Sequence, residues 1–247
     1  MIALLPAEIK RQLGRRPSFL GSTIVNLLFG LGILAWVIFS EAPTTSEALE
    51  GGAGLLTFSG ILTSIVLGAI AGAYDVDQGV MRYLVLTGRP RWQLVVVRIP
   101  ALAVTVVLTL LPAIAVVLVA ALIAPDAGEG FSGERLMDLF YGVPVAGFLY
   151  GFLSLTIGTF LKSSSVAIAV SVVFNFAAFA IIAVIWEYVS ETLAKGFYQV
   201  VAGVAIDREA GTGDEGTFGV PLSLAILAVW LVVLLGAALL RVQRSEY

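Results

Sequence analysis

The chain has 247 residues, of which 59% are hydrophobic and only 13% are charged. A soluble domain of this size could not bury so much apolar surface, so the composition predicts a protein that is folded in a lipid bilayer. Cysteine and histidine are both absent from the sequence. Their absence excludes disulfides, thiolate metal sites, histidine-based zinc proteases and Ser-His hydrolases. The pI near 5.0 gives no indication of a nucleic-acid partner.

Six apolar stretches are long enough to cross the hydrocarbon as helices, which takes roughly 20 residues each. They lie at residues 19–40, 53–73, 94–123, 139–161, 166–186 and 219–240. Because the runs are continuous and not alternating, they predict an all-α membrane protein with a single transmembrane domain over residues 1–247. The third stretch is longer than one crossing needs, and Pro100 and Pro112 are candidate kinks. Arg98 is expected to reach the headgroups from its end of this stretch.

The distribution of charge predicts the topology. If the N-terminus is inside the cell, 11 of the 14 basic residues lie on the cytoplasmic side and 13 of the 17 acidic residues lie outside. The first stretch is too long for a signal peptide core, so we expect it to be retained. The sequence therefore predicts a multi-pass protein of the plasma or inner membrane of a prokaryotic cell, with both termini in the cytoplasm.

Two segments outside the spans have a mixed character. Residues 1–17 place apolar and basic residues on different helical faces, which favours an amphipathic helix in the headgroup plane over an ordinary basic flank. The external segment 187–218 begins with apolar and aromatic residues and continues as a polar loop. Short external re-entrant helices and a simple interfacial linker explain it equally well.

The loop at residues 75–92, between the second and third stretches, has the pattern of a short helix. Asp77 is suited to cap the N-terminus, and Gly88 and Pro90 would end the helix after Thr87. A helix of about three turns is marginal alone, so it should need a packing partner. The alternative is a structured loop that is basic only because it is cytoplasmic, but that loop would not need the capping residues.

The residues of this loop resemble the cytoplasmic loop of permeases in the type-2 family of ATP-binding-cassette (ABC) exporters. Asp75, Asp77 and Gly79 match the acidic start of the family pattern, Arg82-Tyr83-Leu84 match the helix, and Arg89-Pro90-Arg91-Trp92 match the exit. Departures from the pattern are Asp in place of Glu, Val80-Met81 in place of Thr-Leu, and a shorter exit.

The resemblance implies a transport subunit that binds its motor through a coupling helix. The motor would be a cytoplasmic ABC ATPase in two copies, which holds ATP and Mg. The pathway would lie in the lipid bilayer between this chain and a second permease copy or a paralogue. The chain itself has no phosphate-binding loop and is expected to carry no cofactor, no metal and no catalytic residues. The residues expected to contact the ATPase are Asp75, Asp77, Gly79, Val80, Arg82, Tyr83, Leu84, Thr87, Arg89, Pro90 and Arg91.

Polar and small residues inside the stretches leave alternatives open. Asn26 and Asn175 could face a substrate pathway, although hydrogen bonding between helices explains them better. The Gly68/Gly72 and Gly147/Gly151 pairs suit either packing within the chain or a dimer interface.

Two other functions compete with an exporter permease. One is a non-transporting membrane anchor or sensor that recruits a cytoplasmic partner. The other is an intramembrane enzyme, for which Lys162 and the serines that follow it are the only candidates. Substrate identity cannot be read from the sequence.

Overall fold

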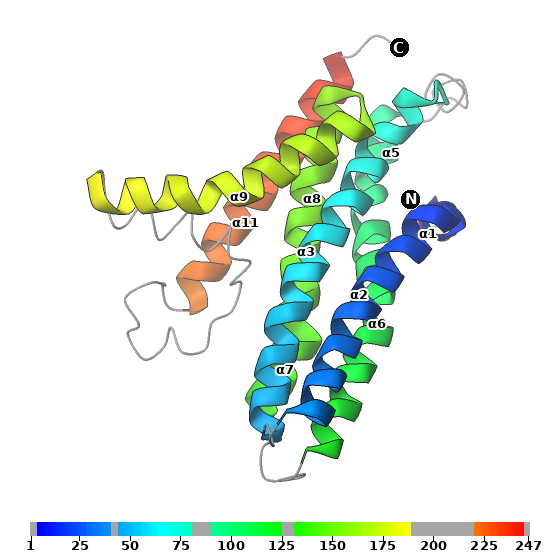
Figure 1. Cartoon of the computed structure of the whole chain (residues 1–247). Helices are drawn as coiled ribbons and strands as arrows, with labels where there is room; N and C mark the ends of the chain where they lie inside the picture. Colours follow the sequence, from blue (N-terminus) through cyan, green and yellow to red (C-terminus); the bar gives the residue numbers. More distant parts are fainter. Residues whose placement is uncertain (1–3, 41–43, 81–89, 125–130, 189–219, 245–247) are drawn as a thin grey trace.

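The computed structural model describes residues 4–40, 44–80, 90–124, 131–188 and 220–244 (Figure 1). In these ranges every regular element is a helix, in agreement with the predicted all-α class. The elements are α1 (Leu4–Gly14), α2 (Arg16–Phe39), α3 (Thr45–Asp77), α5 (Arg91–Val96), α6 (Arg98–Ile123), α7 (Gly133–Met137), the π-helix η1 (Asp138–Gly142), α8 (Val143–Leu161), α9 (Ser164–Tyr188) and α11 (Val220–Arg244).

Four helical units in the described ranges are long and apolar enough to cross a membrane. These are Arg16–Phe39, Thr45–Asp77, Trp92–Ile123 and Arg135–Leu161, and they coincide with the first four predicted stretches. They run side by side as a bundle in which α3 contacts α2, α6 and α8 (Figure 1). Helices α9 and α11 occupy the fifth and sixth stretches, and α9 leaves the bundle at a large angle. The crossing of the membrane by α9 and α11 stays a prediction.

Prolines decide where the long helices are interrupted. The third predicted stretch is divided at Val97 into α5 and α6. Pro100 explains the division because its ring clashes with the carbonyl four residues earlier and it donates no hydrogen bond. Pro112, the other candidate kink, lies inside α6 without ending it. Pro144 follows η1, where the Val143 N–H donates to the Asp138 carbonyl in the wider π pattern.

The end of α3 differs from the sequence prediction. Asp77 is the last residue of α3, not the cap of a new helix. Gly79 has φ +70° and its N–H donates to the Val76 carbonyl at 3.0 Å, which is how a glycine after a helix C-terminus satisfies the last carbonyls. A helix in the loop can therefore begin only after Val80. The rest of the predicted helix, at 81–89, lies outside the described residues.

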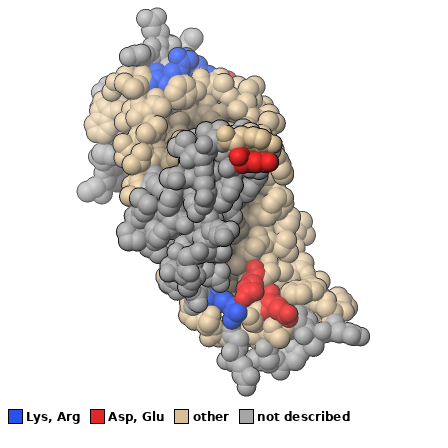
Figure 2. Space-filling model, turned by 90° about the vertical axis from the view of Figure 1, so that its left-hand side faces the viewer, with Lys and Arg blue, Asp and Glu red and all other residues tan. Residues whose placement is uncertain are grey.

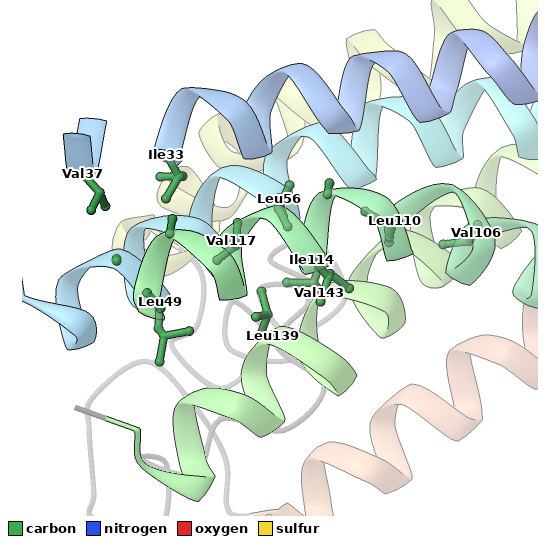
Figure 3. Packing of buried hydrophobic residues seen from close by; sticks show 14 of the residues in the cluster. Ile33, Val37, Leu49, Leu56, Val106, Leu110, Ile114, Val117, Leu139 and Val143 are labelled. Carbon is green, nitrogen blue, oxygen red and sulfur yellow. The ribbon is translucent and has the colours of Figure 1, made fainter. Parts of the chain in front are cut away.

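The apolar core lies between α2, α3, α6 and α8, toward the end of the bundle that is remote from the N-terminus (Figure 3). Leu49 and Leu56 of α3 and Leu110 and Val117 of α6 all belong to this core, and all four are fully buried. Thr44 fixes the start of α3 through a capping box with Glu47.

The α3–α8 contact is close because glycines face each other across it. A Cβ atom on Gly68 would overlap the carbonyl oxygen of Gly151, and one on Gly72 would overlap that of Leu155. Gly147 and Gly151 in turn lie against Ser64 of α3. Both glycine pairs therefore serve packing within the chain, which is one of the two alternatives left open by the sequence.

Candidate functional site: a buried ion cluster beside the loop

Asp75 lies near the end of α3 and is 2% exposed. Its carboxylate accepts from three arginines, which come from different parts of the chain. The Nη atoms of Arg98 in α6 and Arg11 in α1 each lie 2.5 Å from Oδ2, and that of Arg15, between α1 and α2, lies 3.1 Å from Oδ1. We call Asp75, Arg11, Arg15, Arg98 and Glu8 the Asp75 cluster.

Backbone carbonyls of α3 also accept hydrogen bonds from two of the arginines, Arg98 and Arg15. Arg98 donates to the carbonyls of Ala71 and Gly72, at 2.8 and 3.3 Å. Arg15 donates to the Ile70 carbonyl at 3.2 Å, and its guanidinium carbon lies 4.4 Å from the centre of the Tyr74 ring. This is the geometry of a cation–π contact. The predicted reach of Arg98 to the headgroups is wrong, because this side chain is 3% exposed and points at Asp75.

A polar face of α1 docks on the bundle through the same cluster. Glu8 accepts from Arg11 at 2.6 Å, and Gln12 accepts from the Thr105 hydroxyl of α6 at 3.1 Å. Glu8 and Gln12 are buried, whereas Leu5 and Leu13 are only half-buried. An amphipathic helix usually buries its apolar face in the protein. Here Glu8 and Gln12 of the polar face are turned toward the bundle, and apolar residues of α1 stay partly exposed.

Arg11 and Arg15 both stay positively charged, although their surroundings shift their pKa values in opposite directions. Burial lowers the pKa of Arg15 from its ordinary value, against the attraction of Asp75. Burial acts on Arg11 as well, but the hydrogen bond with Glu8 and the charges of Asp75 and Glu8 outweigh it and raise its pKa. Arginine titrates so far above neutrality that either shift leaves a full positive charge on the guanidinium.

The position of the cluster relates it to the loop at 75–92. Asp75 lies two residues before the end of α3, where the chain enters the loop, and Arg98 begins α6, just after the chain leaves it through α5. The ion pair therefore closes the base of the loop. Val95 of α5 also packs with Ala238 of α11, so the exit of the loop is joined to the last helix.

The structure separates the residues that the sequence predicted to contact the ATPase. Asp75 is inside the Asp75 cluster, while Asp77 is exposed and accepts from the Ser164 hydroxyl at 2.8 Å. Gly79 and Val80 are exposed, Pro90 caps α5 and Arg91 is its first residue. Arg82, Tyr83, Leu84, Thr87 and Arg89 lie outside the described residues.

The two asparagines are both buried. Asn26 donates to the Thr109 carbonyl at 3.4 Å and accepts from the Thr63 hydroxyl at 3.3 Å, so it joins α2, α6 and α3. These bonds match the preferred explanation of Asn26, hydrogen bonding between helices. Asn175 of α9 is 6% exposed.

Sequence reasoning missed the cluster as a unit. The available signal was one acid and one arginine at the adjoining ends of consecutive apolar stretches, where unpaired charges are costly. Comparison with protein-family models gave no match to this chain, and comparison with curated proteins gave none either.

Proposed function

We propose that the chain is the transmembrane permease subunit of an ATP-driven ABC exporter, with six spans and both termini in the cytoplasm. It would pair with a second permease and be driven by a separate ATPase through the loop at 75–92. The resemblance of this loop to that of type-2 ABC exporter permeases suggests that the partner is an ABC ATPase. The observation that carries the proposal is the Asp75 cluster, which ties together the helices on both sides of this loop.

The cluster gives a mechanical reason for driving the protein at this loop. A push on residues 78–90 acts on the ends of α3 and α5, which the loop joins. The Asp75–Arg98 pair would transmit it to α6, the Asp75–Arg11 pair to α1, and the Val95–Ala238 contact to α11. Packed helices move as units, so a displacement at this end would change the spacing along the bundle.

The first test is association with the motor. The chain is co-expressed with a candidate phosphate-loop ATPase from the same genome, and the complex is purified on a tag carried by the permease. Leu84→Pro should abolish co-purification of the ATPase because proline breaks the predicted helix. Leu84→Ala keeps the helix, so part of the ATPase should still co-purify. Full retention of the ATPase by Leu84→Pro would contradict the proposal.

A second measurement separates an exporter from a non-transporting anchor. The absence of cysteine allows clean spin labelling of Ile38→Cys on α2 and Tyr141→Cys on η1, both exposed at the end remote from the loop. A transporter should show an ATP-dependent change of the label distance that Leu84→Pro removes. An anchor should show the same distance with and without ATP.

A further inference from the structure

A groove runs along the outside of the bundle between α2 and α3. Pro17, Gly21 and Val25 line it on α2, and Leu62 and Val66 line it on α3, around a volume of about 280 Å³. From Pro17 to Val25 the groove follows α2 for roughly 12 Å, at about 1.5 Å per residue. Ser18, Ser22 and Thr63 also line the groove, but the surface that it exposes is almost entirely apolar, so the groove suits a hydrocarbon chain.

One end of this groove leads to the Asp75 cluster. Leu62 and Val66 are followed at helical spacing by Ile70 and Tyr74. Arg15 donates to the Ile70 carbonyl and its guanidinium lies over the Tyr74 ring. Pro17 at the same end directly follows the exposed Arg16. The groove therefore has an apolar length and a cationic end.

The cationic end carries more positive than negative charge. Its basic residues are Lys10, Arg11, Arg15, Arg16 and Arg98, and its acidic residues are Glu8 and Asp75, so the formal excess is three positive charges. Figure 2 views the molecule from the side on which α9 lies in Figure 1, opposite to α1, and shows basic side chains at the top, an acidic patch below them and a mixed acidic and basic group at the bottom. An anion at the cationic end would be attracted by this excess.

We propose that the groove binds one anionic phospholipid, with an acyl chain between α2 and α3 and the phosphate beside Arg15 and Arg16. A neighbouring face of α2 exposes Ile24 and Leu28 by 55% and 61%, as expected of a surface that touches hydrocarbon. A second copy of the chain fits less well. Two copies in one membrane share an orientation, so each would bring its basic end to the basic end of the other.

The proposal does not depend on transport activity, and glycine positions provide a matched test. A Cβ atom at Gly21, in the groove, or at Gly32, farther along α2, would meet no atom within 4 Å. Gly21→Leu should therefore fill the groove without disturbing the bundle, and Gly32→Leu adds the same side chain elsewhere. Equal melting temperatures of the two variants and the wild type would show that folding is unaffected.

The readout is native mass spectrometry of the full chain in detergent, with phosphatidylglycerol and phosphatidylcholine of identical acyl chains. The wild type and Gly32→Leu should retain phosphatidylglycerol over phosphatidylcholine, and Gly21→Leu should lose most of both lipids. Arg16→Gln should weaken phosphatidylglycerol binding by about fivefold, at about 1 kcal/mol per basic residue, and leave phosphatidylcholine unchanged.

Three results would overturn the proposal. One is equal retention of the two lipids by the wild type. Another is a Gly21→Leu variant that holds as much lipid as Gly32→Leu. The third is a dimer that dissociates in Gly21→Leu while lipid retention stays the same, because that would assign the groove to a second copy.

Discussion

Two regions of the bundle hold α3 in place by different means. Around Asp75, α3 is joined to α1 and α6 by long charged side chains that meet at one carboxylate. Farther along, α3 is joined to α8 by backbone contact at Gly68 and Gly151. Glycine contact fixes the distance between two helices. A charged cluster fixes which groups meet, but the long arginine side chains set the distance between the helix backbones less tightly.

Movement is therefore expected at the Asp75 cluster and not at the α3–α8 contact. The α3–α8 pair should act as one rigid unit, because any separation loses dispersion contacts at many atoms. The joint at Asp75 connects that unit to α1 and α6.

Loss of the central carboxylate should cost the most. Asp75→Asn leaves three arginines without their shared anion, and breaking a buried ion pair typically costs about 3–5 kcal/mol. The free energy of unfolding in mixed micelles measures this loss. Asp77→Asn, two residues away and exposed, is the matched control and should change stability by less than about 0.5 kcal/mol. Equal effects of the two substitutions would show that the cluster does not hold the helices.

The glycine contact should be the next most sensitive. Gly68→Ala would place a methyl group on the Gly151 carbonyl, so the helices must separate, at about 1–3 kcal/mol. Gly54→Ala is the control on α3, where a Cβ atom would meet nothing within 4 Å and the substitution should raise helix stability slightly. Thermal stability in detergent compares the two. If Gly68→Ala were as stable as Gly54→Ala, the close contact would be refuted.

The end of α3 should show a smaller effect. Gly79→Ala puts a Cβ atom on a residue with φ +70°, at a cost of about 1 kcal/mol. Gly79→Asn should recover part of the loss, because asparagine tolerates this conformation. Both variants are measured by unfolding in mixed micelles. An alanine variant that matches the wild type would mean that α3 does not end at a glycine with positive φ.

Hydrogen bonds between helices should contribute least. The Ser154 hydroxyl of α8 donates to the Ile65 carbonyl of α3 at 2.8 Å. The Ser171 hydroxyl of α9 donates to the Ser154 oxygen at 3.0 Å. Ser154→Ala should cost about 0.6 kcal/mol, the average for such bonds in membranes. A loss of stability as large as that of Asp75→Asn would mean that the Asp75 cluster does not hold α3 more strongly than the hydrogen bonds between helices do.

The candidate site could be predicted only in part from the sequence. Asp75 was found through its place in the loop pattern, but Arg11 and Arg15 were assigned to an interfacial helix and Arg98 was expected to reach the headgroups. Arg11, Arg15 and Arg98 lie up to 64 residues from Asp75 along the chain, and no local pattern brings them together. The predicted cap at Asp77 failed for a related reason: local signals could not show that α3 continues to this residue before Gly79 ends it.

The helical class and the positions of the long apolar helices could be read from the sequence alone, because they follow from the length and continuity of apolar runs. The tertiary structure decided which groups meet. It assigned the glycine pairs to the α3–α8 contact, buried Arg98 and turned the polar face of α1 toward the bundle. Periodicity records the faces that a helix has, but the partner that covers each face depends on contacts between distant residues.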